Sequence, residues 1–339
     1  MGKLKLLSLF SGIGAVEEAL KILEVDIDLV GFSEIDKYAI KSYCAIHEVS
    51  EDKNLGDIAK IDIEKLPMDI DLISHGSPCQ DFSVAGLQKG GDKGSGTRSS
   101  LMWDTVAICE HCQPKFVIWE NVKNVLSKKH RHNFDKYLEE MDRIGYNNFY
   151  QILNAKDYGV PQSRERVFVV SIRKDIEKDF KFPKGFDNGI RLKDLLEEEV
   201  EEKYYINTEK AERLISEYKG NLAISYSIRS REFEGWNDNC PTLYARDYKD
   251  PKNVIMPCIT PDRLEKRQPC VLTEGENKTV VEKYRIRKLT PKECWRLMGF
   301  NDESFYKASD VCSNTQLYKQ AGNSIVVNVL IEIFKNLLF

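Results

Sequence analysis

The segment Gly76-Ser77-Pro78-Cys79-Gln80 constrains this chain more than any other feature of its sequence. It follows the apolar run 70–74, which predicts a buried strand. Because Gly76 and Pro78 interrupt regular structure, Cys79 is expected on a turn at the end of that strand, where open α/β sheets place their chemistry. A thiolate there is a strong nucleophile when a nearby positive group lowers its pKa. A lone cysteine is more often a small buried side chain, so the rest of the chain has to decide.

Short apolar runs alternate with segments of helical period over residues 4 to 172. This alternation predicts an α/β fold with a Rossmann-like, doubly wound, mainly parallel sheet and helices on both faces. The expected strands are 4–10, 29–32, 72–74, 116–119, 149–153 and 166–172, and the expected helices are 13–23, 38–46, 101–109 and 134–144.

The pattern changes after about residue 180. The acidic stretch 195–203 is interpreted as a solvated helix face near a domain edge. Residues 204–285 have no clear period, which predicts a smaller, loop-rich domain, and the apolar final helix 324–338 is expected to pack back on the first domain. We therefore predict a catalytic, cofactor-binding domain of residues 1–180, completed by 315–339, and a small domain of residues 181–314.

Composition indicates an ordinary globular protein, with 42% hydrophobic and 31% charged residues. No apolar run reaches the roughly 20 residues that span a bilayer, and the first residues do not form a secretory signal, so we expect a cytoplasmic protein with no membrane partner. The nine cysteines are scattered and odd in number, against a disulfide framework. Cys109-Glu110-His111-Cys112 lacks a second ligand pair, so no metal is expected. The net charge is −4, so binding to nucleic acid would depend on local clusters of basic residues.

The first strand runs into Ser11-Gly12-Ile13-Gly14 and a helix. Glycines at this turn let a ligand approach the backbone closely. The dinucleotide fingerprint needs a third glycine at position 17, which is Glu17, so the pattern disfavours a pyrophosphate cofactor and permits a nucleoside. Glu34, at the end of the second strand, suits hydrogen bonds to ribose hydroxyls, and Asp57 suits an adenine amino group.

With these residues in place, the chain resembles the C5 cytosine DNA methyltransferases of bacterial and phage restriction–modification type over nearly its whole length. The matching segments, in the family's linear order, are Phe10-Ser11-Gly12-Ile13-Gly14, Glu34, Asp57, Gly76-Ser77-Pro78-Cys79-Gln80, Trp119-Glu120-Asn121-Val122, Gln162-Ser163-Arg164-Glu165-Arg166, Arg287-Lys288-Leu289-Thr290-Pro291-Lys292-Glu293-Cys294 and Gln320-Ala321-Gly322-Asn323-Ser324.

The resemblance implies the S-adenosylmethionine-dependent methyltransferase fold, with S-adenosyl-L-methionine as methyl donor and S-adenosyl-L-homocysteine as product. Phe10 is expected to stack near the adenine and Glu34 to hold the ribose. The implied cofactor contacts are Phe10, Gly12, Ile13, Gly14, Glu34, Ile35, Asp57, Ile58, Pro78, Leu101, Asn323 and Ser324.

The implied reaction is DNA cytosine-5 methylation. Cys79 attacks C6 of the cytosine, which makes C5 carbanion-like, and Glu120 interacts with N3 if burial raises its pKa. Arg164 and Arg166 alternate on an extended segment, so both are expected on one face, to bind the cytosine O2, brace Glu120 or hold a phosphate. The target base is expected to be flipped out of the duplex, as methyltransferases do as a class.

Two segments are expected to contact DNA. A glycine-rich basic stretch after Cys79 suits a lid over the DNA backbone. The small domain is expected to be the target-recognition domain, because it mixes basic and aromatic residues. The implied DNA contacts are Gln80, Lys89, Lys93 and Arg98 in the first segment, and Arg229, Arg231, Thr242 and Arg246 in the second.

Two alternatives stay open. A tRNA cytosine-5 methyltransferase of the same superfamily typically carries Pro-Pro-Cys, whereas position 77 is Ser here. A catalytically silent DNA-binding homologue is expected to have lost Cys79, Glu120, Arg164 or Arg166, and all four are present. The expected partner is double-stranded DNA within a short specific sequence. A cognate restriction endonuclease would act on the same site without binding this chain, which is expected to be a monomer in a bacterial cell or phage-infected host.

Overall fold

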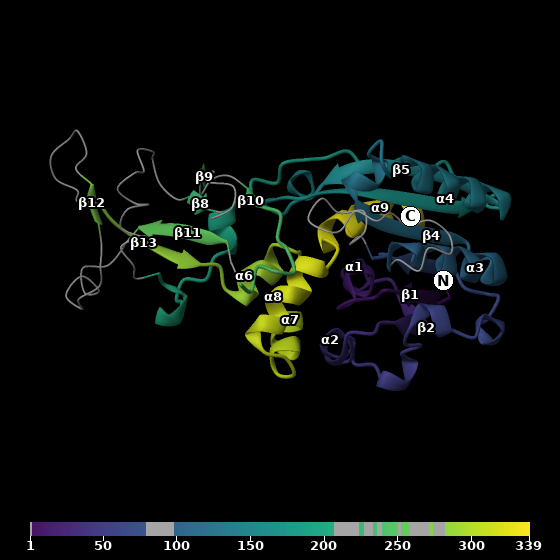
Figure 1. Ribbon diagram of the computed structural model, residues 1–339, viewed down its shortest axis with the longest axis horizontal. Coiled ribbons are helices and arrows are strands. Elements are labelled where there is room, and N and C mark those ends of the chain that lie inside the picture. The colour runs from purple at the N-terminus through teal and green to yellow at the C-terminus, as the bar shows by residue number, and fades with distance from the viewer. Residues whose placement is uncertain are drawn as a thin grey trace.

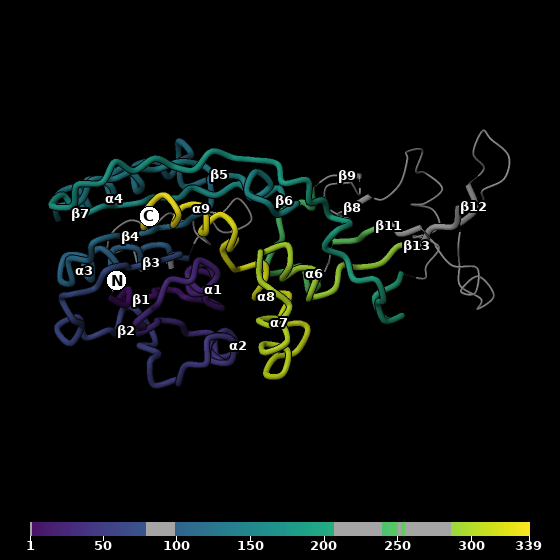
Figure 2. The backbone as a smooth tube through the Cα atoms, turned by 180° about the vertical axis from the view of Figure 1, so that it is seen from behind, coloured from purple at the N-terminus to yellow at the C-terminus, as the bar shows by residue number. Residues whose placement is uncertain are grey.

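The computed structural model describes residues 2–78, 98–206, 224–226, 233–235, 239–249, 252–257, 271–273 and 282–339. It is elongated, with a large α/β part at one end, a small antiparallel sheet at the other and a group of helices between them (Figures 1 and 2). Both ends of the chain lie in the large part (Figure 1).

Six strands form the large sheet in the order β2-β1-β3-β4-β7-β5. The first four are parallel, β7 runs antiparallel to β4, and β5 runs antiparallel to β7. The predicted α/β fold with a mainly parallel sheet is confirmed. The strands are β1 (Leu4–Leu9), β2 (Ile27–Ser33), β3 (Leu72–His75), β4 (Phe116–Val122), β5 (Tyr146–Asn154) and β7 (Glu165–Arg173).

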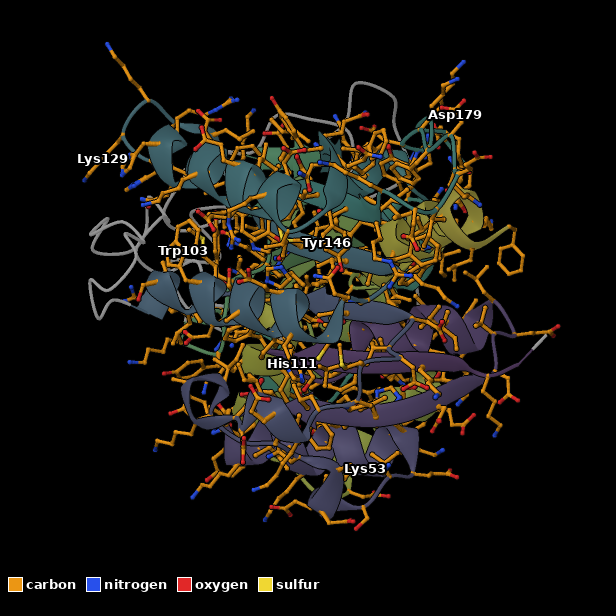
Figure 3. All side chains as sticks on the ribbon, turned by 90° about the vertical axis from the view of Figure 1, so that its right-hand side faces the viewer. Lys53, Trp103, His111, Lys129, Tyr146 and Asp179 are labelled. Atoms are coloured by element: carbon orange, nitrogen blue, oxygen red, sulfur yellow. The ribbon has the colours of Figure 1, made fainter. Side chains whose placement is uncertain are left out.

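Helices cover both faces of this sheet because successive side chains of each strand point to opposite sides. On one face lie α1 (Ala15–Ile22) and α9 (Val327–Leu338), and on the other α3 (Met102–Cys112) and α4 (Arg131–Arg143). Figure 3 views the molecule from the side on which Trp103 and His111 mark α3. Leu6, Leu72, Ile118 and Phe168 join the core under α1 and α9, whereas Leu7, Ile73, Val117 and Val169 join the core under α3 and α4.

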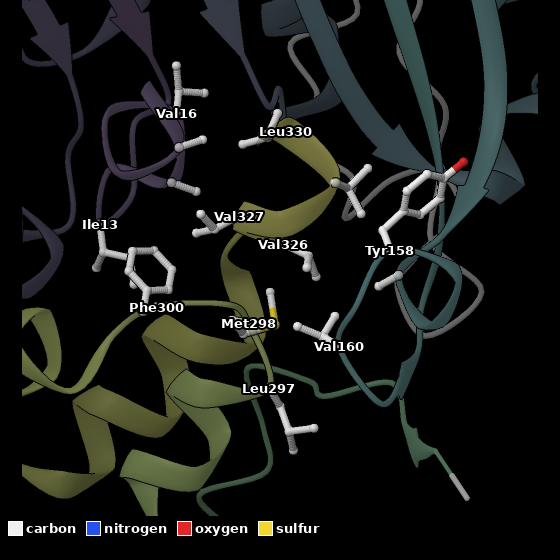
Figure 4. Close-up of a cluster of buried hydrophobic side chains, with 14 of the residues drawn as sticks. Ile13, Val16, Tyr158, Val160, Leu297, Met298, Phe300, Val326, Val327 and Leu330 are labelled. Atoms are coloured by element: carbon white, nitrogen blue, oxygen red, sulfur yellow. The ribbon is translucent and has the colours of Figure 1, made fainter. Parts of the chain in front are cut away.

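The core under α1 and α9 extends into the helices that follow the small sheet. These are α6 (Pro291–Arg296), α7 (Asp302–Ser309) and α8 (Asn314–Asn323), and α7 packs against α2 (Lys37–His47). Figure 4 shows Ile13 and Val16 of the first turn and helix beside Phe300, Val327 and Leu330. The final helix therefore packs on the first part of the chain, while the boundaries of the two domains stay a prediction.

The small sheet has the strand order β12-β13-β11-β8-β9, and every described pairing in it is antiparallel. The sequence predicted only a loop-rich region here, because three of these strands have three residues each, too few to reveal an alternating pattern. The strands are β8 (Ile224–Tyr226), β9 (Phe233–Gly235), β11 (Asn253–Pro257), β12 (Val271–Thr273) and β13 (Glu282–Lys288).

Two short strands, β6 (Gln162–Ser163) and β10 (Cys240–Pro241), pair in parallel between the two parts. Single 3-10 turns complete the described elements: η1 (Glu51–Lys53), η2 (Ile58–Lys60), η3 (Ile63–Lys65), η4 (Arg98–Leu101), η5 (Lys123–Leu126), η6 (Ala155–Asp157), η7 (Leu192–Leu195) and η8 (Glu202–Tyr204).

The acidic stretch 195–203 forms no α-helix, so the helix expected there is wrong, although most of its residues are solvated as expected. Glu197 in this stretch is half-buried. Its Oε1 lies 2.6 Å from Lys292 Nζ, and its backbone N–H donates to Glu293 Oε1 at 2.8 Å. Its other glutamates, Glu198, Glu199, Glu201 and Glu202, are exposed.

One described helical stretch, 314–338, is long and apolar enough by composition to cross a bilayer. It consists of α8 and α9, and half of the relevant window is buried inside the protein. A core helix of a globular protein passes the same test, and α9 packs on α1 in that manner.

Candidate active site

The turn between β1 and α1 has an unusual backbone. Phe10, Gly12 and Gly14 have φ angles of 53°, 57° and 80°, in the left-handed region. A non-glycine residue held there is strained, and such strain concentrates at functional sites. A Cβ on Gly12 would meet no atom within 4 Å among the described residues, whereas one on Gly14 would lie 2.0 Å from His47 Nε2. The turn therefore keeps an open backbone at Gly12 and packs tightly at Gly14.

Glu34 lies directly against this turn. Its Oε2 accepts a hydrogen bond from the backbone N–H of Gly12 at 3.0 Å, and its Oε1 accepts from those of Ile35 and Asp36 at 2.8 Å each. The structure thus brings together the glycine turn and the acid that the sequence placed at the end of β2. Ile35 beside it is 74% exposed, an unusual position for a large apolar side chain and a suitable surface for a flat ring.

A pocket opens at the carboxyl ends of β1, β3 and β4, beside the start of α9. Among its walls are Phe10, Gly12, Glu120, Asn323 and Ser324, all named from the sequence. Its other walls are Ser8, Leu9, Ser11, Ala15, Val16, Glu17, Ser74, His75, Gly76, Ile118 and Ile325.

Three buried polar atoms on residues that line this pocket have no hydrogen-bond partner within the described chain. They are Ser11 Oγ, Glu17 Oε2 and His75 Nδ1. Buried polar groups in folded proteins are nearly always paired, so Ser11 Oγ and Glu17 Oε2 beside the β1–α1 turn are available to a ligand. The ring of His75 instead stacks on Trp119 and bonds to Tyr137 through Nε2. None of the three was expected from the sequence to contact the cofactor, although Ser11 stands in the first matching segment. Their positions at strand ends and in the first turn of a helix were the available signal.

The chain after β3 is fixed as far as Pro78. Trp119 Nε1 donates to Ser77 Oγ at 3.0 Å, and Asn121 Nδ2 donates to the carbonyl oxygen of Ser77 at 3.2 Å. Ser99 Oγ donates to the carbonyl oxygen of Pro78 at 2.8 Å. Ser77 is buried, so β4 and the residues before α3 hold the backbone that leads to position 79.

Glu120 and Arg166 form an ion pair, with Arg166 Nε 3.0 Å from Glu120 Oε1 and both side chains mostly buried. The register explains it: Glu120 pairs with Phe168 across β4 and β7, so Arg166 lies two residues along on the same face. Burial raises the pKa of Glu120, and the positive charges of Arg166 and Arg164 oppose that rise. Burial is the larger of these effects, so the protonated carboxyl group is more favourable at Glu120 than at an exposed glutamate.

Arg164 has a different environment from Arg166. It is 3% exposed, and its guanidinium donates to the carbonyl oxygens of Leu243, Gly322 and Ser324 at 2.9, 3.2 and 2.8 Å. These three hydrogen bonds go to backbone carbonyls, although the charge of Arg164 still acts on the pKa of Glu120.

The remaining residues expected to contact the cofactor lie around the turn or behind it. The side chains of Ile13 and Ile58 are buried in the two cores, so only their backbones can face a ligand. Asp57 is half-buried and caps η2 by accepting from the N–H of Ala59 at 3.2 Å. Leu101 is half-buried at the start of α3.

Several expected site residues lie outside the part of the chain that the structure describes. Thr242 and Arg246 do lie within it: Thr242 Oγ1 donates to the carbonyl oxygen of Ser163 at 2.6 Å, and Arg246 is exposed. The backbone of Arg98 belongs to η4, without a description of its side chain. Those outside are Cys79, Gln80, Lys89, Lys93, Arg229 and Arg231.

The comparison with known families matches residues 4–338 to the C-5 cytosine-specific DNA methylases. The chain belongs to this family. An orphan methyltransferase of Bacillus phage SPR is 38% identical, with 100% of this chain and 98% of that protein covered. A type II methyltransferase of Lactococcus lactis subsp. cremoris is 36% identical, with coverages of 98% and 99%. The resemblance expected from the motifs is thereby confirmed, and the enzyme class is DNA (cytosine-5)-methyltransferase.

Solved structures support the fold. The DNMT2 protein of Spodoptera frugiperda superimposes with a TM-score of 0.71 at 22% identity, covering 99% of this chain and 100% of that one. The Dnmt2 methyltransferase of S. pombe gives 0.67 at 19% identity, with the same coverages. Such low identities establish a shared architecture, the α/β methyltransferase fold, and leave the substrate to the sequence family.

Proposed function

We propose that this methylase uses S-adenosylmethionine to methylate C5 of a cytosine that it flips out of a short specific duplex sequence, with Cys79 as the nucleophile. The observation that carries the proposal is the buried Glu120, held by Arg166 at 3.0 Å on the wall of the pocket that the β1–α1 turn also lines. A raised carboxyl pKa beside a pocket is the arrangement that a proton donor to a base requires.

Cys79 follows Pro78, the last described residue before the nucleophile. Its thiolate forms a bond to C6 of the cytosine, and the electron pair of the C5–C6 double bond shifts towards C4 and N3. Protonation of N3 then leaves an enamine in which C5 is nucleophilic. After methylation of C5, loss of the C5 proton to a base and expulsion of Cys79 restore the double bond. Trp119 and Asn121 anchor Ser77 and thereby fix the backbone two residues before Cys79.

Glu120 and Arg166 stabilise the ring during attack. The protonated carboxyl group of Glu120 donates to N3 of the cytosine, where negative charge develops as the thiolate adds. Arg166 fixes the orientation of that carboxyl group, and its remaining guanidinium N–H groups suit the O2 atom of the base. Both groups are fixed in advance by the register of β4 and β7, which limits reorganisation during the reaction.

The residues of the pocket and of the adjoining β1–α1 turn suit the proposed cofactor. When bound, S-adenosylmethionine supplies an electrophilic methyl group on a sulfonium. Glu34 suits its ribose hydroxyls, exposed Ile35 its adenine, and the open backbone at Gly12 its close approach. The unpaired Ser11 Oγ and Glu17 Oε2 supply polar positions for its amino-acid end. Phe10, Asn323 and Ser324 complete the proposed contacts from the walls.

The proposed partner is double-stranded DNA, contacted by the glycine-rich basic stretch and by the small sheet and its connections. Exposed Arg246 and anchored Thr242 are the described members of the proposed contact set. We infer a monomer that acts in the cytoplasm of a bacterium or of a phage-infected host, with or without an endonuclease that cuts the same sequence.

Bisulfite sequencing of plasmid DNA from a host without cytosine methylation tests this proposal. The full chain and its Cys79→Ser variant are expressed in parallel, and S-adenosylmethionine binding by each purified protein is checked by calorimetry. The proposal predicts methylated cytosines in one short recurring context with the wild type and none with the variant. Folded, cofactor-binding wild-type protein that leaves every plasmid cytosine unmodified would point to the RNA substrate or to a silent binder.

A further inference from the structure

Arg164 links its own segment to two others that are far away in the sequence, around Leu243 and at 322–324. Its buried guanidinium donates from Nη1 to the carbonyl oxygen of Leu243 at 2.9 Å. From Nη2 it donates to the carbonyl oxygens of Ser324 at 2.8 Å and Gly322 at 3.2 Å. A planar guanidinium can satisfy several carbonyls at once in fixed directions, which a lysine ammonium on a flexible stem cannot reproduce.

The first segment that Arg164 holds is a wall of the cofactor pocket. Asn323 and Ser324 line that pocket, at the end of α8 and just before α9. The carbonyl oxygen of Ser324 accepts from Arg164, so the position of this wall depends directly on the guanidinium.

The second segment is the turn 242–249, which follows β10 and leads to β11 of the small sheet. It is tied to the Arg164 segment by backbone and side chains: β10 pairs with β6, Thr242 Oγ1 donates to the carbonyl oxygen of Ser163, and the N–H of Leu243 donates to Gln162 Oε1. Both β6 and β10 lie at the junction between the large and small parts (Figures 1 and 2).

The outer face of this turn is basic and aromatic. Tyr244 is 50% exposed, Tyr248 is 37% exposed, and Arg246 and Lys249 are exposed as well. Buried Asp247 rigidifies the turn, because its Oδ2 accepts from the N–H of Tyr244 at 2.9 Å. Exposed arginine, lysine and tyrosine on a rigid turn suit contacts with a nucleic-acid backbone and bases.

Direct packing reinforces the connection between the two segments. A Cβ on Gly322 would lie 2.2 Å from the backbone N of Ala245 and 2.2 Å from the carbonyl carbon of Tyr244. The turn therefore rests on the end of α8 without room for a side chain between them.

We propose that Arg164 is a positioning residue that couples the cofactor pocket to the DNA-contacting turn, so that occupation of either site strengthens binding at the other. This inference rests on the proposed function. One guanidinium bonds to both segments, so a ligand that orders one segment also orders the guanidinium and lowers the entropic cost of ordering the other. The coupling is reciprocal by thermodynamic necessity.

The test is a binding cycle on the full chain. The Kd of S-adenosylhomocysteine is measured by calorimetry with and without a duplex that carries the sequence found by bisulfite sequencing. We expect the duplex to tighten binding about tenfold in the wild type, within the usual range of allosteric coupling. Arg164→Lys is expected to bring this factor below about twofold. The coupling factor is a ratio of two Kd values, so it is read independently of any change that Arg164→Lys makes to the affinity for S-adenosylhomocysteine alone.

Two further variants separate coupling from folding. Gly322→Ala leaves Arg164 intact and forces the turn away from α8, so it is expected to reduce the coupling factor in the same direction. Arg296→Lys is the matched control, because Arg296 is a half-buried arginine whose hydrogen bonds go to Asp302 and to the carbonyl oxygen of Leu195 and to neither of the two segments. It is expected to keep the wild-type coupling.

The outcomes are distinct. Wild-type coupling in a folded Arg164→Lys, or a wild type in which the duplex does not change the Kd, would overturn the inference. If Arg164→Lys does not fold, Gly322→Ala decides alone. A wild-type protein that neither methylates nor binds the duplex would contradict the proposed function instead.

Discussion

Arg166 Nε lies 3.0 Å from Glu120 Oε1. The register of β4 and β7 places them together, because Glu120 pairs with Phe168 and Arg166 lies two residues from Phe168 on the same face of the sheet. The pair has two opposing effects. Burial makes the charged form of Glu120 unfavourable, and the guanidinium offsets only part of that effect. The raised pKa makes the protonated form of Glu120, which can donate to a base, more favourable than it is in an exposed glutamate.

The first prediction concerns the rate of methyl transfer in Glu120→Gln. We expect the single-turnover rate to fall by roughly 10²- to 10⁴-fold, the range for losing a general acid, while the affinity for S-adenosylmethionine changes little. Rapid-quench kinetics and calorimetry measure the two quantities separately. A matched change is Glu165→Gln on the neighbouring strand position, an exposed residue that pairs with Lys123. Equal losses of rate in both variants would contradict the role of Glu120.

The same variant has a predicted signature in stability. The pKa of Glu120 is higher in the folded protein than the ordinary 4.5, so its stabilising contribution is complete below 4.5 and is lost as pH rises through the folded-state pKa. Glu120→Gln does not titrate. Its free energy of unfolding relative to the wild type should therefore increase with pH across that window. Urea unfolding at several pH values measures the difference, and parallel pH curves would exclude the raised pKa.

His75 gives a prediction of the opposite sign. Burial lowers its pKa to about 3 from the ordinary 6.5, so the ring is neutral in the folded protein. The unfolded chain binds the proton first, and stability is lost as pH falls from 6.5 towards 3. At pH 5.5 the loss is about 1 to 2 kcal/mol. In His75→Gln this part of the acid dependence should disappear. A variant with an unchanged acid limb in its unfolding free energy would contradict the assignment.

The pair Arg287–Glu293 is the most buried ion pair of the described chain, with both side chains fully inaccessible and Nη2 to Oε1 at 2.6 Å. Removing one partner of such a pair leaves an uncompensated charge, so Glu293→Gln should lower the free energy of unfolding by about 3 to 5 kcal/mol. The control is Glu332→Gln, which breaks a surface pair with Lys335 and should cost less than about 1 kcal/mol. Denaturant unfolding compares them, and similar small costs would refute the prediction.

Local sequence patterns predicted the layers of the large sheet well, for a physical reason. Strands such as β1 and β3 carry apolar residues on both faces, and α1 and α9 carry an apolar stripe, so period alone identifies them. The antiparallel direction of β7 was not predictable, because a buried strand has the same composition in either direction. The short strands of the small sheet carry too little periodic signal.

The candidate site was predictable to the same extent. Glu34 and Gly12, Glu120 and Arg166 meet because each lies at or near the end of a strand, which sequence reveals. The hydrogen bonds of Arg164 to the carbonyls of Leu243, Gly322 and Ser324 depend on how three distant segments pack. No local pattern contains that information, and none marked the unpaired Nδ1 of His75.

The measurement that tests the central claim most directly is covalent capture of the nucleophile. The purified chain is incubated with S-adenosylmethionine and a duplex in which the target cytosine carries fluorine at C5. After methylation this C5 has no proton to lose, so the bond between Cys79 and C6 cannot be released by elimination. The account predicts a stable protein–DNA adduct whose peptide mass maps to Cys79 and which fails to form with Cys79→Ser. An enzyme that methylates unmodified DNA but gives no adduct, or an adduct at another cysteine, would contradict it.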